Sequence, residues 1–550
     1  MKIISKDDLN DLASLNVLII DDNRLVHDFL KHTLFNLGFK TVRCAENAYH
    51  GLALCEETHF HIIICSFNVK SDKDGFHLLE ELKFKGYVTK TTILIFLSTE
   101  TSEALVNSVV ELEPDDFWVK PLLPKTVITR IKHTLDLKKH LFNLYQAIDL
   151  QQPSKVIYYA DRFLLDNTLI KFHPNIERMK GNALIHLQEY KEAEIFFRAL
   201  QSKYKYAWVY VGYVKALLKQ GKMQEIESLL TELKNKPDTR FATYDILAQH
   251  YIEHEQFELA YKAIQKATTL SPRNIERNKK SWDLARLTHD HLGQYTATKN
   301  MALYGKNSIH DSPNLLLNVI RSGIDLACTI TDESYTKILS ETDKYIKQLE
   351  YGYKDIHLLK EQIVVVKARL HNIRDEKNKA SALVENHLSL KPAQSIEDNL
   401  DKVKVFHELG MKEEAMILLK ALKNQISGDS LTGDVLNKYV DQETNERTDV
   451  NFTPKQLNKM AVEFFQRDKL LPALTSVVQA LKLAPKNVKL LFSLLKVLIV
   501  MKNRDEVTKE HIALAESAIE QLESTSLDDK KLHIFSRLKI KWGGDIDSNP

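Results

Sequence analysis

The first 140 residues alternate between short apolar runs and longer amphipathic segments. Five runs rich in β-branched residues predict β-strands, and they cover residues 16–20, 40–44, 61–65, 92–98 and 115–119. Five segments with apolar residues at helical spacing predict α-helices, and they cover residues 24–38, 48–57, 75–86, 102–112 and 125–141. Because strands and helices alternate, we expect right-handed β-α-β crossovers and a doubly wound, five-stranded parallel sheet of the α/β class.

From about residue 143 onward the pattern is that of helices alone, and it recurs with a period near 34 residues. In the clearest unit, two helices share an apolar face formed by Tyr244, Leu247, Ala248, Tyr251, Phe257, Ala260, Ile264 and Ala267. Pro272 ends that unit, since proline cannot continue a helix. Ala193, Ile226 and Ala260 are equivalent positions, 33 and 34 residues apart. Packing positions of other copies are Gly181, Phe197, Ala461, Ala473 and Pro485.

These patterns predict a multidomain chain, an α/β domain followed by an all-α superhelix. We expect the α/β domain at 14–138, helical repeats at 143–310, irregular and degenerate helical repeats at 311–425, and C-terminal repeats at 455–540. The polar segment 426–454 is expected to be a loop or linker. Residues 543–550 are expected to be a disordered tail.

Composition narrows the classes of function. The 550 residues include 76 Lys and Arg against 74 Asp and Glu, so no charge excess favours nucleic acid or an anionic membrane. The apolar stretch Leu490–Met501 is shorter than the roughly 20 residues of a membrane span. No apolar leader precedes the first strand, so we expect a cytoplasmic protein without membrane insertion. No glycine-rich phosphate loop, HExxH or paired-cysteine motif occurs, so we expect no enzyme activity.

Polar side chains stand where the predicted strands end. Asp21 and Asp22 follow the first strand, Ser66 the third, Ser98 the fourth, and Lys120-Pro121 the fifth. The carboxyl ends of parallel strands meet at one edge, which is where such sheets bind ligands. Paired carboxylates suit Mg²⁺, and a hydroxyl and an ammonium suit phosphoryl oxygens. The sequence therefore predicts a polar site at this edge.

These strand ends resemble those of response-regulator receiver domains, which are CheY-like and have a flavodoxin-like fold. The resemblance rests on "LIIDDNRLVHDFL", "FLSTETS" and "DDFWVKPLLP", and it covers residues 14–138. It implies an acidic pocket of Asp21, Asp22 and Asn68, and switch and phosphate-site counterparts at Ser98, Phe117, Lys120 and Pro121, usually with a cis peptide before Pro121. It also implies partner docking at Arg24, Leu25 and Leu122.

The segment "CSFNVKSDKDG" departs from this family. Without a gap, it places Ser66 where receiver domains have their phospho-accepting aspartate. A serine hydroxyl has a far higher pKa than a carboxylic acid, so acyl-phosphate chemistry is not expected there. Asp72 and Asp74 are the alternative acceptors, although Asp74 before Gly75 suits a helix N-cap better. The retained residues have two interpretations. Lys120 pairs with the acidic residues and has a structural role, or the remaining oxygens bind Mg²⁺ weakly. In neither interpretation is a cofactor required.

The helical repeats resemble tetratricopeptide repeats, which implies a superhelix whose concave face binds a protein. Exposed candidates for that face are Lys180, Asn182, Lys215, Asp245 and Gln249. A receiver joined to such repeats resembles auxiliary response regulators of the VieB type. This resemblance implies a sensor histidine kinase or cognate response regulator as partner, and a second protein bound by the repeats. Two alternatives remain: a phosphorylation-switched regulator with a surrogate acceptor, and a repeat scaffold in which the receiver is a dimerisation module. No basic recognition helix follows the receiver, so no nucleic acid is expected.

Overall fold

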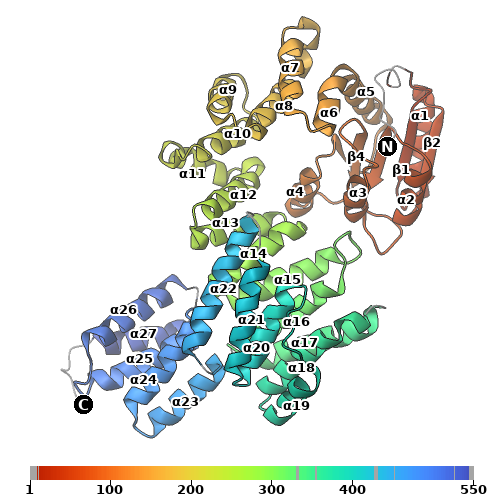
Figure 1. The fold of residues 1–550 in the computed structure, drawn as a ribbon. Coiled ribbons are helices and arrows are strands. Elements are labelled where there is room, and N and C mark those ends of the chain that lie inside the picture. The colour runs from red at the N-terminus through yellow and green to blue at the C-terminus, as the bar shows by residue number, and fades with distance from the viewer. Residues whose placement is uncertain are drawn as a thin grey trace. The chain divides into compact units, whose positions relative to one another are not determined.

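The computed structural model describes residue 9 and residues 11–329, 333–353, 356–426, 431–450, 452–525 and 527–543. The chain forms two compact units (Figure 1). Unit 1 contains residues 1–277 and 303–311, and unit 2 contains residues 278–302 and 312–550. Among the described residues, no helix combines the length and the apolar character that a membrane span requires.

Unit 1 begins with a five-stranded parallel sheet in the order β2-β1-β3-β4-β5 (Figure 1). The strands are β1 (Asn16–Ile20), β2 (Thr41–Ala45), β3 (Ile62–Ser66), β4 (Ile93–Ser98) and β5 (Asp116–Val119). The helices between and after them are α1 (Arg24–Leu37), α2 (Ala48–Glu57), α3 (Gly75–Phe84), α4 (Glu103–Glu111) and α5 (Pro124–His140). The predicted doubly wound α/β fold is confirmed.

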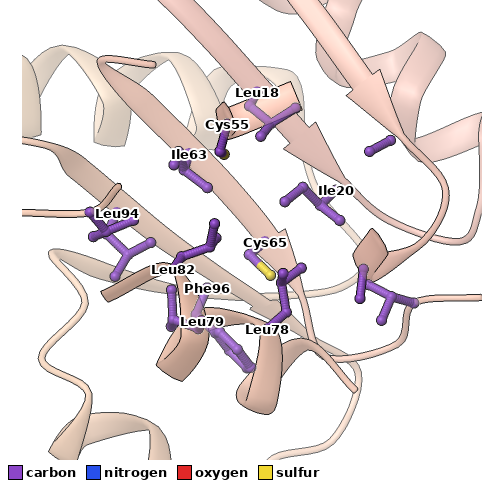
Figure 2. Packing of buried hydrophobic residues seen from close by; sticks show 14 of the residues in the cluster. Leu18, Ile20, Cys55, Ile63, Cys65, Leu78, Leu79, Leu82, Leu94 and Phe96 are labelled. Carbon is purple, nitrogen blue, oxygen red and sulfur yellow. The ribbon is translucent and has the colours of Figure 1, made fainter. Parts of the chain in front are cut away.

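Each face of this sheet is covered by its own apolar core. Figure 2 shows one core, in which strand side chains from β1, β3 and β4 face α2 and α3; its labelled members are Leu18, Ile20, Cys55, Ile63, Cys65, Leu78, Leu79, Leu82, Leu94 and Phe96. The alternate residues of the same strands, among them Ile19, Ile64 and Ile95, form the second core with α1 and α5. Both faces are apolar because parallel sheets are covered on both sides.

The rest of the chain is helical, and its described residues form 22 α-helices, α6 to α27. Those of unit 1 are α6 (Phe142–Asp149), α7 (Pro153–Leu164), α8 (His173–His186), α9 (Tyr190–Lys203), α10 (Ala207–Leu218), α11 (Glu227–Asn235), α12 (Pro237–Glu253) and α13 (Phe257–Leu270). Two helices have residues in both units, α14 (Ile275–Leu287) and α15 (His291–Gly305). Those of unit 2 are α16 (Pro313–Ala327), α17 (Glu333–Gly352), α18 (Lys360–Ile373), α19 (Lys377–His387), α20 (Ile396–Glu408), α21 (Lys412–Gln425), α22 (Leu431–Asp449), α23 (Pro454–Gln466), α24 (Leu470–Leu483), α25 (Val488–Lys502), α26 (Lys509–Ser524) and α27 (Asp529–Gly543).

The small residues of the repeat pattern lie where paired helices meet. Ala193, Ala248, Ala260, Ala461 and Ala473 are all buried, whereas Tyr244, Tyr251, Pro272 and Pro485 are partly exposed. The buried Phe197 ring packs directly against two glycines, Gly181 and Gly212. A Cβ atom at either glycine would come within about 2.5 Å of that ring. A side chain at either position would therefore have to displace the buried Phe197 ring. That the pairs are tetratricopeptide repeats stays a prediction.

The segment expected to be a polar loop differs from the expectation. Helix α22 occupies most of 426–454, so the loop prediction is wrong for residues 431–449. The helix buries one apolar stripe, Val435, Leu436, Tyr439 and Val440. These residues have helical spacing, which the many polar residues around them obscured. Of the expected tail 543–550, Gly543 ends α27 and the others lie outside the described residues.

Unit 2 also buries a network of ion pairs. Arg369 is 1% exposed, and its guanidinium bonds to Asp325, Asp401 and Glu408 at 2.6–2.7 Å. Burial alone raises the pKa of Asp325, but Lys404 and Arg369 hold that pKa well below its usual value. A charge removed from such a network leaves its partners buried and unpaired, which is strongly destabilising.

Candidate functional site

Four strand ends bring polar side chains together at the carboxyl edge of the sheet. Asp21 and Ser66 are 0% and 1% exposed, and Ser98 is 1% exposed. Lys120 follows β5, and its backbone N–H donates to the Ser98 carbonyl at 3.0 Å. Parallel strands place these residues at one edge, as the sequence predicts.

The Lys120 ammonium joins three of these strand ends. It lies 2.5 Å from Asp21 Oδ2 and donates to Ser66 Oγ at 3.1 Å. The other Asp21 oxygen accepts the backbone N–H of Asn23 at 2.9 Å. Both carboxylate oxygens of Asp21 therefore already have partners within the protein.

The switch counterparts lie beside this pair. Ser98 Oγ accepts the backbone N–H of Glu100 at 2.9 Å, and the Phe117 ring stacks on Phe96 at 5.9 Å. The Lys120-Pro121 peptide bond is cis, as the resemblance implies. Phe117 is half-buried and packs against the apolar core.

The backbone around Ser66 explains the glycine at the end of "CSFNVKSDKDG". The Gly75 N–H donates to the Phe67 carbonyl at 2.8 Å, so the loop returns directly onto the strand end. A Cβ at Gly75 would lie 1.7 Å from the Ser66 carbonyl oxygen, and only glycine fits there. The neighbouring Cys65 is fully buried, and burial raises the pKa of its thiol, so Cys65 is protonated rather than nucleophilic.

The two alternative acceptors have other partners. Asp74 caps α3 by accepting the His77 N–H at 2.9 Å, as its position before Gly75 predicts. Asp72 is exposed and accepts the Tyr49 hydroxyl of α2 at 3.0 Å. The Lys120 ammonium bonds instead to Asp21 and Ser66. Neither Asp72 nor Asp74 belongs to that cluster.

The remaining acidic residues fit Mg²⁺ poorly in this arrangement. Asp21 is committed to Lys120 and Asn23, whereas Asp22 and Asn68 are exposed. In the described part of the chain, no group of three or more His, Cys, Asp and Glu side chains is arranged to hold a metal ion. The position that would supply another carboxylate is Ser66.

The expected docking residues lie next to this site, at the start of α1 and on the loop after β5. Leu25 is 76% exposed at the start of α1, and Arg24 is exposed and bonds to Glu46 at 2.8 Å. Leu122 instead packs against the core under α1 and α5, while Leu123 is 65% exposed. Leu122 is thus partly buried and less accessible than Leu123, and its role in docking stays a prediction.

A second set of contacts, which the sequence did not indicate, joins this domain to later helices of unit 1. The Arg273 guanidinium bonds to Asp74 at 2.7 Å and lies 5.0 Å from the Phe67 ring and 5.5 Å from the Tyr304 ring. His77 Nε2 lies 2.8 Å from the Tyr304 carbonyl oxygen. Arg273 thus contacts both ends of the loop that begins at Ser66.

Helix α4 is bonded to α12–α14 in the same unit. Glu103 pairs with Arg240 of α12, and Glu111 pairs with Arg277 of α14. Ser108 Oγ lies 3.2 Å from Ser271 Oγ. Asp245, expected on a concave binding face, accepts from Arg277 at 2.9 Å, and its place on such a face stays a prediction. One side of the N-terminal domain is therefore occupied within the chain.

Residues 17–132 match the family model of the response regulator receiver domain. The chain is 26% identical over 121 residues to the transcriptional regulatory protein GltR of Pseudomonas aeruginosa, and 28% identical over 130 residues to the transcriptional regulatory protein AruR of the same organism. Each alignment covers 22% of this chain, and 48% and 50% of the two relatives. The chain thus spans about half the length of the curated relatives it matches.

Solved structures similar to the chain are also receiver proteins. The chemotaxis response regulator CheY4 of Vibrio cholerae is 25% identical, with 22% of this chain and 98% of that chain covered and a TM-score of 0.21. A CheY-like receiver domain protein from Methanospirillum hungatei JF-1 is 28% identical, with 23% and 96% covered and a TM-score of 0.20. On the family match and the sheet topology, the N-terminal domain is a response regulator receiver domain of two-component signalling.

Proposed function

We propose that this chain is an auxiliary regulator of a two-component pathway and acts by binding proteins. Its receiver accepts no phosphoryl group at Ser66, and it does no enzymatic chemistry. The observation that carries the proposal is the cluster of Ser66, Lys120 and Asp21, in which a hydroxyl replaces the reactive carboxylate. Asp21 is bonded to Lys120 and Asn23, so it is not free to act as a base for Ser66.

The same cluster supports a structural role for the retained residues. The Asp21–Lys120 ion pair joins the loop before α1 to the loop after β5. Leu25, at the start of α1, and Leu123, on the loop after β5, are the exposed apolar side chains next to this ion pair and form the docking surface. A receiver that lacks phosphoryl chemistry thereby keeps a surface that binds a sensor histidine kinase. On that kinase, it competes with the receiver that normally accepts the phosphoryl group.

The helical repeats supply the second binding element. In the VieB-type arrangement that this chain resembles, a tetratricopeptide-like superhelix binds a further protein partner. Two binding elements in one chain raise the effective concentration of each for a shared complex. Neither role requires a cofactor or nucleic acid.

Two other functions remain as alternatives. A phosphorylation-switched regulator would use Asp72 or Asp74, but their bonds to Tyr49, His77 and Arg273 favour structural roles. A scaffold would use the receiver for dimerisation. The contacts of α4 with Arg240 and Arg277 disfavour a dimer built on that helix, because a second copy would have to replace them.

Phosphorylation by a small donor tests the chemical half of the proposal. Purified full-length chain is incubated with acetyl phosphate and Mg²⁺, and its intact mass is measured. We expect no added phosphoryl group. A stoichiometric, hydroxylamine-labile phosphate on residues 14–138 would contradict the proposal and favour a surrogate aspartate.

Competition tests the binding half. Phosphotransfer from a purified histidine kinase of the same genome to its own receiver is measured with increasing amounts of the chain. We expect inhibition by the wild type and much weaker inhibition by Leu25→Asp. Phe84→Asp is the matched control, because Phe84 is also 76% exposed but lies at the end of α3. Equal inhibition by the Leu25 and Phe84 variants would refute the docking surface.

A further inference from the structure

Unit 1 contains a cavity of about 570 Å³ at the edge of the sheet where β4 and β5 begin, which is opposite to Ser66. Its receiver wall includes Lys83, Lys90 and Asp115, and its other wall is formed by α6, α7 and α8. The volume lies within the range of small-molecule sites in proteins. This cavity is independent of the function proposed above.

Specific bonds hold the two walls together. The Asp149 carboxylate of α6 accepts the backbone N–H groups of Lys90 and Thr91 at 2.6 and 3.0 Å. The buried Lys138 ammonium bonds to Asp115 at 2.8 Å and lies 4.1 Å from the Tyr145 ring. Because backbone and buried side chains make these bonds, the cavity is a built feature of unit 1.

The charges around the cavity are unequal. Four cations line it, Lys83, Lys90, Lys138 and Arg178, against two carboxylates, Glu113 and Asp115. Lys90 pairs with Glu113, and Lys138 pairs with Asp115. Lys83 donates to the Leu112 carbonyl, and in the part of the chain that the structure describes no carboxylate is bonded to Lys83 or Arg178. Among the side chains that line the cavity, cations therefore outnumber carboxylates by two.

The Lys83 ammonium is short of compensating charge. Burial is the main reason that its pKa falls to about 8; the neighbouring Lys90 and Lys138 act in the same direction, and Glu113 and Asp115 act in the opposite direction. A bound anion would supply the missing negative charge. Charge-assisted bonds from an ammonium and a guanidinium are the strong kind for carboxylates and phosphates.

The rest of the lining is apolar with a few amides. Leu94, Ile148, Val156 and Met179 contribute aliphatic surface. Gln152 also lines the cavity, and its buried Oε1 has no hydrogen-bond partner in the protein. Such a mixture suits a ligand with an apolar body and one anionic group.

We propose that this cavity binds a small organic anion, whose carboxylate or phosphate lies between Lys83 and Arg178 and whose apolar body contacts Leu94, Ile148 and Met179. Because Lys83 belongs to α3 of the receiver and Arg178 to α8, the ligand bridges the receiver and the first helical repeats. Its binding stabilises unit 1 by mass action.

Calorimetric titration of the full-length chain tests this site with phenyl phosphate, benzoate and inorganic phosphate as probes at pH 7. We expect binding of at least one aromatic anion, weaker binding of inorganic phosphate, and at least a tenfold loss of affinity in Lys83→Met and in Arg178→Met. Lys155→Met is the control, because Lys155 is an exposed α7 residue outside the lining. The two aromatic probes distinguish a phosphate-binding site from a carboxylate-binding site.

The pH dependence of the anion affinity tests whether Lys83 is the cation that binds the ligand. Between pH 7 and pH 9 Lys83 loses its proton, so affinity for the wild type falls, whereas Lys83→Arg keeps its charge and its affinity. Circular dichroism verifies that each variant is folded. The proposal is overturned if no probe binds at 10-millimolar concentration, if the Met variants bind as the wild type does, or if inorganic phosphate binds as tightly as phenyl phosphate.

Discussion

Replacing Ser66 with aspartate returns a carboxylate to the receiver pocket. Ser66 Oγ and Asp21 Oδ2 both contact the single Lys120 ammonium, at 3.1 and 2.5 Å. In Ser66→Asp, two carboxylates share that ammonium in a site that solvent barely reaches. We therefore expect the variant to bind Mg²⁺, which the wild type binds weakly or not at all.

The magnitude follows from the charges. Two carboxylates about 4 Å apart repel by about 4 kcal/mol at an effective dielectric constant near 20, and attraction to Lys120 offsets a similar amount. Without metal, the two carboxylates share one ammonium, so one of them is incompletely paired. This incomplete pairing lowers the stability of the variant by about 1–3 kcal/mol. Mg²⁺ at ten times its dissociation constant restores about 1.4 kcal/mol by mass action. Binding requires Lys120 to release Asp21, so the affinity will be modest.

The assay is calorimetric titration of Mg²⁺ into the full-length wild type, Ser66→Asp and Ser66→Asn. Hydrogen exchange of the β3 amides, with and without Mg²⁺, reports local stability, since unfolding of a multidomain chain is not two-state. We expect Mg²⁺ binding and Mg²⁺-dependent protection in Ser66→Asp alone. Equal Mg²⁺ affinity in the wild type and Ser66→Asp would refute the placement of position 66 in the acidic pocket.

Three further predictions concern packing and charge. Ala260→Glu places a carboxylate at a 0%-exposed position between α12 and α13, so it will lower stability by several kcal/mol; circular dichroism melting will show no such loss for Lys262→Glu, an exposed site on the same helix. Arg273→Ala removes the 2.7 Å bond to Asp74, worth about 1–3 kcal/mol for a charged partner, and faster hydrogen exchange at 66–76 will show it, whereas unchanged exchange would contradict the role of Arg273. Burial raises the pKa of Asp283 to about 7, and its buried Oδ2 has no partner. The folded state therefore holds a proton that the unfolded state releases near pH 4, so the free energy of unfolding falls as the pH rises from 4 to 7. Asp283→Asn does not titrate. Urea unfolding of unit 2 will therefore show a smaller decrease of stability with pH in this variant than in the wild type.

Several features of the receiver follow from its sequence. Apolar periodicity predicts the five strands and the helices between them, because each element must bury one side. Parallel strand order then brings Asp21, Ser66, Ser98 and Lys120 to one edge. The serine at position 66 is visible in the sequence itself, whereas the need for glycine at position 75 appears only in the structure, where a Cβ would meet the Ser66 carbonyl.

The helical region was harder to predict. The apolar stripe of α22, with Leu436, Tyr439 and Val440, is a signal that sequence reasoning overlooked among polar neighbours. The buried network around Arg369 gave no signal, because its partners Asp325, Asp401 and Glu408 lie 32 to 44 residues away in the chain. Periodicity identifies which residues face inward only when they are apolar.

The sequence by itself determined the alternating fold of the receiver, the set of polar strand ends and the serine at the end of the third strand. Only the tertiary structure decided that Lys120 pairs with Asp21, that Leu123 rather than Leu122 is exposed, and that Arg273 contacts the loop after Ser66. It also decided where Lys83 and Arg178 line a common cavity. The physical reason is that periodicity records burial along one element, whereas these contacts depend on the paths of loops and on the packing of helices distant in the chain.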